Sequence, residues 1–246
     1  MIDLHCHILP GLDDGPAEFE ESLRMAKLAA NDGITTIVAT PHLLEIRPRL
    51  VESYINQAAA AADQLNRLLK KEQLPLTVKL GFEAALSPEL PELAAQFSAV
   101  TIEGLRKYML VELPSSQFPL YAEETFFRLQ AQGICPIVAH PERNSALQRE
   151  PEILESLVER GLLAQATASS FLGVSGRKAQ RALENWCRKG YIQIVGSDAH
   201  SSDHRPPVLS SARKVLTQLV GKERADWIGE VPARVLAGKE VKTSFG

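Results

Sequence analysis

Imidazole and carboxylate side chains recur in this sequence at positions where runs of apolar residues end. His5 and His7 stand two residues apart in the first run, so a strand would point both rings to the same side. Asp14 follows in the turn after that run, and the other candidates close five later runs. These candidates are His42, Glu83, Glu112, His140, Asp198 and His200. Acids and imidazoles gathered in such numbers need bound cations, so the pattern predicts a metal site with more than one ion.

Each of these residues also has an ordinary structural explanation when it is taken alone. A single histidine at the end of a strand more often forms a hydrogen bond in a loop than binds a metal ion. Asp14 could be a turn or helix-capping residue, and Glu83 or Glu112 could stabilise the N-terminus of the following helix. The metal site is favoured because nine such residues, rather than one, fall at these positions.

The chemistry of the candidates indicates which ions and which reaction to expect. A mixture of imidazoles and carboxylates without thiolates suits Mn²⁺, Fe²⁺ or Zn²⁺ rather than a structural zinc site with four cysteines. Two or three such ions, roughly 3.5–4 Å apart, can stabilise the oxygens of an in-line displacement, which favours hydrolysis of a phosphate ester. Arg143 and Arg205 lie close to the candidates in sequence. Their guanidinium groups match phosphate oxygens, although a surface salt bridge is the alternative for each.

Seven short apolar runs would supply the strands that position these residues. Most are rich in β-branched or large aliphatic residues, as expected for strands buried on both faces. They cover residues 2–6, 34–40, 76–82, 108–113, 134–139, 162–167 and 191–195. Amphipathic helical patterns lie between or after them at residues 19–30, 50–69, 120–130, 153–159, 178–188 and 208–220. This alternation predicts an α/β fold with a parallel sheet.

A closed barrel and an open sheet both fit the alternation of strands and helices. The open nucleotide-binding sheet is disfavoured because no G-x-G-x-x-G motif follows the first strand. In a barrel, active-site residues come from the C-terminal ends of several strands, which is where this sequence has its candidates. We therefore expect a TIM-like barrel of seven strands that occupies residues 1–246 as a single domain.

The composition argues against several other classes of protein. Of the 246 residues, 45% are hydrophobic and 23% are charged, and the formal net charge is −3, which disfavours a protein that grips nucleic acid or an anionic membrane. The three cysteines form no C-x-x-C pair and indicate free thiols in a reducing compartment. No signal-peptide pattern and no apolar stretch of about 20 residues is present. We therefore expect a cytoplasmic protein without membrane insertion.

Six short motifs resemble, in this order, those of the polymerase-and-histidinol-phosphatase (PHP) superfamily. They are His5-x-His7, Asp14-Gly15-Pro16, Pro41-His42, Gly81-x-Glu83, His140-Pro141-Glu142-Arg143 and Ser197-Asp198-x-His200. Within that superfamily the chain looks most like the bacterial manganese-dependent protein-tyrosine phosphatases of capsule and exopolysaccharide operons, the CpsB/YwqE type. The match runs from residue 2 to about residue 206. Residues 230–233 depart from the Asn-Pro pair that relatives tend to carry.

The resemblance implies a distorted (β/α)₇ barrel, the PHP fold, with three divalent metal ions, preferably Mn²⁺ with Fe or Zn as alternatives. It assigns the first ion to His5, His7, Glu83 and Asp198. It assigns the second ion to Glu83, as a bridging ligand, with Glu112 and His140. It assigns the third ion to Asp14, His42 and His200. His204 is then the one histidine outside the site.

The resemblance also implies a substrate and a partner. Arg143 and Arg205 would hold the phosphate of phosphotyrosine, in the tail of a tyrosine autokinase that controls polysaccharide export. Cysteine-dependent tyrosine phosphatases instead carry a C-x₅-R motif. The residues six positions after Cys6, Cys135 and Cys187 are Leu12, Pro141 and Gln193, so that motif is absent. The expected nucleophile is therefore water activated by the metal ions.

Two other functions stay open on the sequence alone. One is the same hydrolysis applied to a small phosphomonoester such as histidinol phosphate. The other is a non-catalytic metal-binding regulator that docks a kinase, which the full set of ligands disfavours. The oligomeric state is open as well, because the apolar residues of 208–220 could face either the barrel or a second subunit.

Overall fold

Parallel strands form the centre of the molecule. The computed structural model describes residues 1–44 and 47–243, and their strands make two sheets in the orders β1-β2-β4 and β3-β5-β6-β7-β8-β9. The strands are β1 (Ile2–Cys6), β2 (Thr36–Ala39), β3 (His42–Leu43), β4 (Thr77–Leu80), β5 (Glu83–Ala85), β6 (Tyr108–Glu112), β7 (Cys135–Ala139), β8 (Leu163–Thr167) and β9 (Ile194–Gly196). Every pairing between them is parallel.

Two of the seven predicted strands are each followed by a further short strand that was not predicted. The run at 34–40 forms β2, and β3 follows it after a break at Thr40 and Pro41; the run at 76–82 forms β4, and β5 follows it. Proline has no amide hydrogen to donate to a ladder, which favours the first break. Because β2 pairs with β4 and β3 pairs with β5, both breaks lie at the same level of the sheet. The nine strands of the described residues therefore occupy seven positions around the sheet, because β3 follows β2 and β5 follows β4.

Contacts between the first and last strands close the barrel. Asp198 donates its backbone N–H to the carbonyl of His5 at 2.8 Å, and His7 donates to the carbonyl of Ala199 at 2.8 Å. The Asp3 carboxylate accepts a hydrogen bond from the Ser197 N–H at 2.9 Å. The predicted distorted (β/α)₇ barrel is thus confirmed, since the parallel strands follow one another around the molecule and a bridge between Cys6 and Ala199 joins the first strand to the segment after the last.

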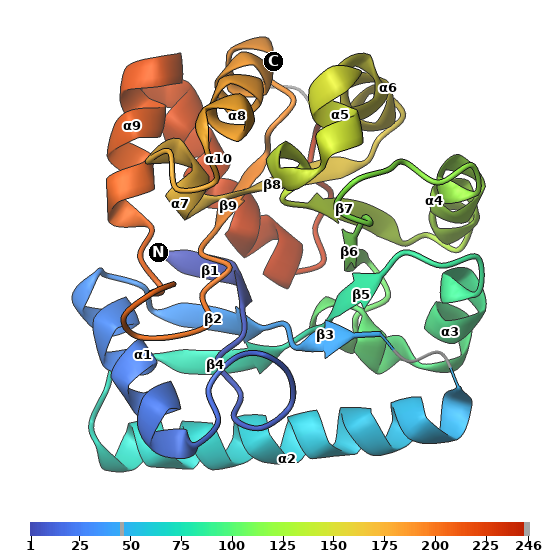
Figure 1. Ribbon diagram of the computed structural model, residues 1–246. Coiled ribbons are helices and arrows are strands. Elements are labelled where there is room, and N and C mark those ends of the chain that lie inside the picture. The colour runs from blue at the N-terminus through green and yellow to red at the C-terminus, as the bar shows by residue number, and fades with distance from the viewer. Residues whose placement is uncertain (45–46, 244–246) are drawn as a thin grey trace.

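Helices surround the strands on the outside, with the long α2 along one edge of the molecule (Figure 1). They are α1 (Phe19–Asn31), α2 (Pro48–Lys71), α3 (Leu90–Gln96), α4 (Ala122–Ala131), α5 (Ser145–Arg149), α6 (Glu152–Glu159), α7 (Ala168–Phe171), α8 (Arg177–Lys189), α9 (Ser210–Val220) and α10 (Lys222–Leu236), with 3₁₀ turns η1 (Ser98–Val100), η2 (Ile102–Gly104) and η3 (Pro141–Arg143). All six predicted helices are present within a few residues of their expected ends. Within the described ranges, no helix is long and apolar enough to cross a membrane.

The barrel interior is filled by apolar side chains at its N-terminal end. Leu4, Leu110 and Ile137 pack there with Val231 and Val235 of α10, which lies across that end. The segment 230–233, where the sequence departs from its relatives, is part of this helix and contains a buried proline. Because α10 closes one end of the barrel, the polar residues of the interior are left at the opposite end.

Candidate metal centre

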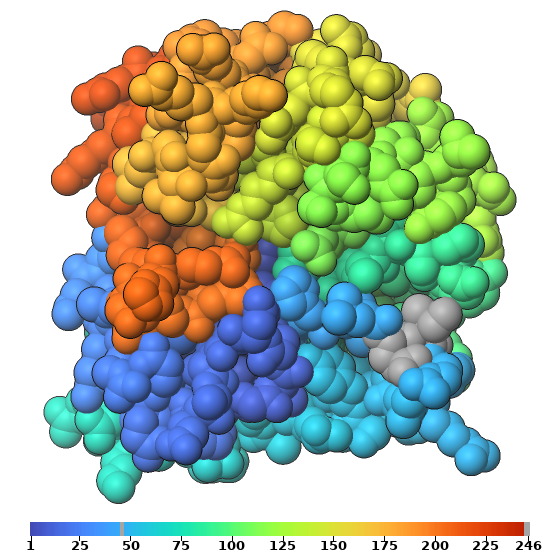
Figure 2. Space-filling model, in the orientation of Figure 1, coloured from blue at the N-terminus to red at the C-terminus, as the bar shows by residue number. Residues whose placement is uncertain are grey.

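The nine predicted ligands gather at the C-terminal end of the barrel. β1, β3, β5 and β6 carry His5, His42, Glu83 and Glu112, and the remaining candidates lie in the segments that follow β1, β7 and β9. Figure 2 shows three of these segments meeting on one face: dark blue after β1, light blue at β3 and orange after β9. The breaks in the strands matter here, because β3 and β5 begin at His42 and Glu83 and pair these two residues directly.

The Glu83 carboxylate is the hub of the cluster. It is fully buried, and its Oε2 lies 3.1 Å from His5 Nε2, 3.2 Å from His7 Nε2 and 3.1 Å from His42 Nδ1. Its Oε1 lies 2.8 Å from His140 Nε2. One carboxylate thus contacts four imidazoles that come from three different segments of the chain.

Around this hub, potential ligand atoms form three overlapping groups within 4.8 Å of one another. The groups are His5, His7, Glu83 and Asp198; His42, Glu83 and Glu112; and His7, Asp14, His42 and His200. His140 joins the second group through Nε2, which is 3.7 Å from Glu112 Oε1. The structure therefore brings together each set that the resemblance implies, and it adds His7 to the third set and His42 to the second.

Several ligand atoms in the cluster form no hydrogen bond, although other ligand atoms lie close to them. Glu83 Oε2, His42 Nδ1 and His200 Nε2 are buried without a hydrogen bond. Burying a polar atom without a partner is unfavourable, so native structures seldom leave one. Three such atoms of metal-ligating type, all facing one centre, fit divalent cations as their partners.

The protonation of the cluster is uneven. Burial lowers the pKa of His7, but the nearby Asp13 and Glu83 carboxylates outweigh it and raise that pKa to about 10. Burial and the nearby positive charge of His7 lower the pKa of His200 to about 4. The pKa of Glu112 is raised, first by burial and then by the negative charge of Glu83. At neutral pH His200 is therefore a neutral imidazole, the form that binds metal.

Two residues that the sequence did not single out orient the imidazoles. Asp13 Oδ2 lies 2.7 Å from His7 Nδ1 and accepts the His42 backbone N–H at 3.0 Å. Gln165 Oε1 lies 2.7 Å from His5 Nδ1. Such partners fix the second ring nitrogen, so Nε2 of His5 and of His7 faces the centre. Two signals in the sequence were available. Asp13 is the neighbour of Asp14 in the same turn, and Gln165 lies in the one predicted strand that neither an acid nor an imidazole follows.

Two glycines allow the close approach of these segments. A Cβ at Gly15 would lie 2.5 Å from the carbonyl oxygen of His7. A Cβ at Gly196 would lie 2.7 Å from Gln165 Nε2 and 2.9 Å from His5 Cβ. Since real Cβ atoms do not come this close, only glycine fits at either position.

The predicted phosphate-binding arginines lie at the rim of the cluster. Arg143 Nη1 is 2.5 Å and Arg205 Nη2 is 2.8 Å from the same oxygen, Asp198 Oδ2. Both guanidinium groups remain partly exposed, whereas the Asp198 side chain is buried. His204 is 90% exposed, outside the cluster, as predicted.

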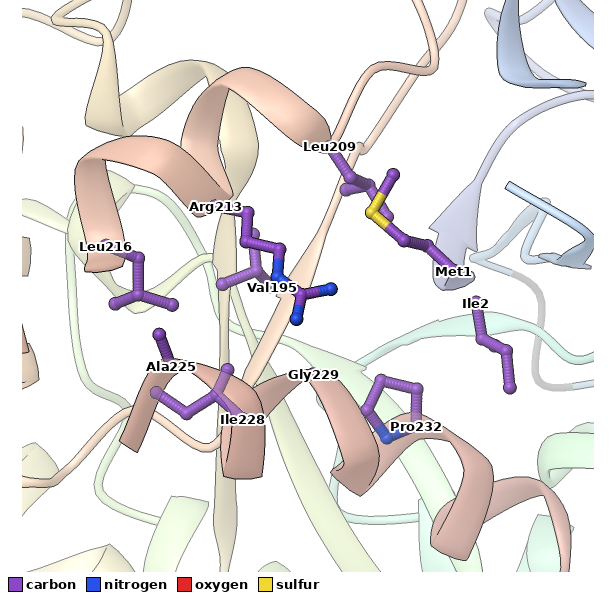
Figure 3. A pocket seen from close by; sticks show the side chains of 10 residues that line it. All are labelled: Met1, Ile2, Val195, Leu209, Arg213, Leu216, Ala225, Ile228, Gly229 and Pro232. Carbon is purple, nitrogen blue, oxygen red and sulfur yellow. The ribbon is translucent and has the colours of Figure 1, made fainter. Parts of the chain in front are cut away.

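Another pocket lies far from this cluster, between α9, α10 and the start of β1 (Figure 3). Its volume is about 150 Å³, and its lining is apolar except for Arg213. That arginine is paired with Asp226 at 2.8 Å. Because the lining contains no imidazole or carboxylate, this pocket does not offer the groups that hydrolysis requires.

Comparisons with known proteins agree with this geometry. Residues 1–236 match the family model for capsular polysaccharide synthesis, CpsB/CapC. The chain is 38% identical over 226 residues to the tyrosine-protein phosphatase YwqE of Bacillus subtilis, covering 91% of this chain and 86% of that protein. It is 35% identical over 214 residues to CapC of Staphylococcus aureus, covering 85% and 80%.

A solved structure from work on YwqE and on CpsB of Streptococcus pneumoniae, described as metal-dependent tyrosine phosphatases, is similar throughout. Its TM-score is 0.90 at 34% identity, and the match covers 98% of this chain and 96% of that chain. A family model that spans nearly the whole chain, and relatives above 30% identity over most of their length, lead to one conclusion. The chain belongs to the CpsB/CapC family of capsular polysaccharide synthesis.

Proposed function

We propose that this chain is a metal-dependent phosphatase that removes phosphate from phosphotyrosine in a protein. The observation that carries the proposal is the convergence of four imidazoles on the buried Glu83 carboxylate, with buried ligand atoms that form no hydrogen bond. The names of the relatives support the substrate class. YwqE is named a tyrosine-protein phosphatase, and the work on its crystal structure describes it as a metal-dependent tyrosine phosphatase.

Three divalent ions, preferably Mn²⁺ with Fe or Zn as alternatives, are the proposed cofactors. The first is assigned to His5, His7, Glu83 and Asp198, the second to Glu83, Glu112 and His140, and the third to Asp14, His42 and His200. When bound, such ions polarise phosphoryl oxygens and make water a better nucleophile at neutral pH. The three ligand sets differ in their exposure to solvent. The Asp14 side chain in the third set is 63% exposed, whereas those of His5 and Glu83 in the first set are fully buried.

The residues around the ions bind and orient the substrate. Arg143 and Arg205 lie side by side on Asp198, and their exposed N–H groups can donate to phosphate oxygens. Asp13 and Gln165 keep the histidine rings in place during turnover. A tyrosine leaving group has a pKa of about 10, so it departs with little assistance from a general acid.

The proposal includes a partner and a compartment. The family description supports a role in capsular polysaccharide synthesis, and we assign the phosphotyrosine to a tyrosine autokinase of polysaccharide export. The three cysteines are free, which is consistent with a cytoplasmic enzyme. We treat residues 1–246 as one catalytic domain.

Metal removal tests the function directly. We expect a chelator to abolish hydrolysis of a phosphotyrosyl peptide, and Mn²⁺ to restore it, because the proposed ions activate the water nucleophile and polarise the phosphate. The measurement is phosphate release together with metal content. Full turnover by the metal-free protein would contradict the proposal. Faster hydrolysis of histidinol phosphate would favour the small-molecule alternative, and bound metal without turnover would favour a regulator.

Thiol chemistry is not expected to contribute. A nucleophilic cysteine needs a lowered pKa, but burial raises the pKa of the Cys135 thiol to about 12 and also raises that of Cys6. We therefore expect Cys135→Ala, and wild-type protein treated with iodoacetamide, to keep their rate with a phosphotyrosyl peptide. A rate loss above tenfold after alkylation, with metal content unchanged, would contradict a metal-based mechanism.

A further inference from the structure

An open apolar pocket adjoins the proposed metal centre. Its volume is about 480 Å³, and its walls come from the loop after β1, from β3 and from α2. Asp14 and His42, two of the proposed ligands, line it together with Asp13. The rest of its lining consists of Leu12, Leu43, Leu44 and Tyr54. The pocket and the centre are therefore continuous, and a molecule bound at the ions would reach these apolar side chains.

Hydrogen bonds hold the walls of this pocket in place. Tyr54 donates its hydroxyl to the Leu12 carbonyl at 3.2 Å, which ties α2 to the loop after β1. The Tyr54 ring packs on Phe82 with the ring centroids 5.9 Å apart. Leu44, at the pocket entrance, is 71% exposed. An exposed leucine beside a pre-formed pocket is available to cover an apolar ligand.

A second pocket on the other side of Asp14 has the opposite character. Its volume is about 540 Å³, and Arg205 and His200 line it together with the Arg24–Glu21 ion pair and Asp203. Asp14 lines both pockets, so they meet at the metal centre. A ligand that spans the centre would thus have guanidinium and imidazole groups on one side and leucine and tyrosine side chains on the other. This division matches an aryl phosphate, which is anionic at one end and aromatic at the other.

We propose that Leu43, Leu44 and Tyr54 form the subsite for the aromatic ring of phosphotyrosine. This inference rests on the proposed function and names the residues that select its substrate. A cavity of about 150 Å³ suffices to bind benzene, so this open pocket has room for the ring. Aromatic and apolar contacts with Tyr54 and Leu44 favour the ring over the short side chain of phosphoserine, which cannot fill the pocket. The three residues are specificity-determining and take no part in bond breaking.

The experiment compares two ligands that share a phosphonate group and differ only in the apolar part. Phenylphosphonate and methylphosphonate are titrated calorimetrically into the full-length, Mn²⁺-loaded protein. We expect the phenyl compound to bind more tightly, and Leu44→Asn to reduce this preference about tenfold. The matched control is Leu120→Asn, because Leu120 is fully exposed and remote from the pocket; its preference should equal that of the wild type.

Two results would overturn the subsite. They are equal binding of the two phosphonates by the wild type, or an unchanged preference in both Leu44→Asn and a second variant, Tyr54→Ser. Leu44 is exposed, so its variant is expected to fold normally. Because the titration needs no turnover, the two proposals fail separately. A phenyl preference without hydrolysis contradicts only the function, and hydrolysis without a phenyl preference contradicts only the subsite.

Discussion

Glu83→Gln is expected to lower kcat for a phosphotyrosyl peptide by about 10³-fold or more, since an ion supplies several kcal/mol of transition-state stabilisation. The substitution keeps the size of the side chain but removes the charge that contacts four imidazoles at 2.8–3.2 Å. The proposed first and second ions share this carboxylate, so we expect the variant to lose metal as well as activity. The measurements are kcat with excess Mn²⁺ and metal content by mass spectrometry.

A matched control separates this effect from a general loss of charge. Glu92 lies on α3 with its side chain 62% exposed, in an ion pair with Arg128, and Glu92→Gln should keep both metal and kcat. Glu112→Gln, at a partly exposed ligand, provides a second variant should Glu83→Gln fold poorly. If both ligand variants retained wild-type kcat with full metal content, the assigned ligand sets would be wrong.

The barrel could be predicted because its signal is local. Each of the seven strands is an apolar run followed by a helical pattern, and both are visible within about ten residues. The breaks at Thr40–Pro41 and near Gly81 could not be predicted, because the apolar runs end at residues 40 and 82 and the strands beyond them, β3 and β5, have only two and three residues. Their position depends on pairing between segments distant in the sequence, such as the hydrogen bond that the Gly81 N–H donates to the Ala39 carbonyl.

The helices that were not predicted have two different causes. α3, α5 and α7 contain seven residues or fewer, which is too short for a period of 3.6 to be recognised. α10 is long, but Gly229 and Pro232 interrupt its pattern. Proline is unfavourable inside a helix, yet Pro232 is tolerated because Val231 and Val235 are buried against the barrel. Tertiary packing therefore outweighs the local preference.

The types of residue at the site could be read from the sequence, but their partners could not. A histidine or an acid at the end of a strand identifies a candidate by position. The pairing of His5 with Gln165 joins β1 to β8 across 160 residues, and no local pattern encodes it. The same holds for Asp13. It is adjacent to Asp14 in the sequence, so spacing does not show that the Asp13 carboxylate contacts His7 whereas that of Asp14 contacts His200.

Arg143→Ala and Arg205→Ala are each expected to lower kcat/KM by about 10²-fold, the usual cost of losing a hydrogen bond between charged groups. Both guanidinium groups contact Asp198, so a loss of activity alone would not distinguish phosphate binding from positioning of that carboxylate. The inhibition constant of inorganic phosphate and the metal content make the distinction.

If the arginines hold phosphate, its inhibition constant rises in each variant while the metal content stays at the wild-type value. If they only position Asp198, metal is lost and the inhibition constant of the remaining loaded enzyme is unchanged. Arg160→Ala is the control, since Arg160 pairs with Glu123 at 2.8 Å on the outer surface. We expect the first result, because the backbone N–H of Asp198 donates to the His5 carbonyl and fixes this residue without the arginines, whereas a phosphate dianion offers oxygens to both guanidinium groups.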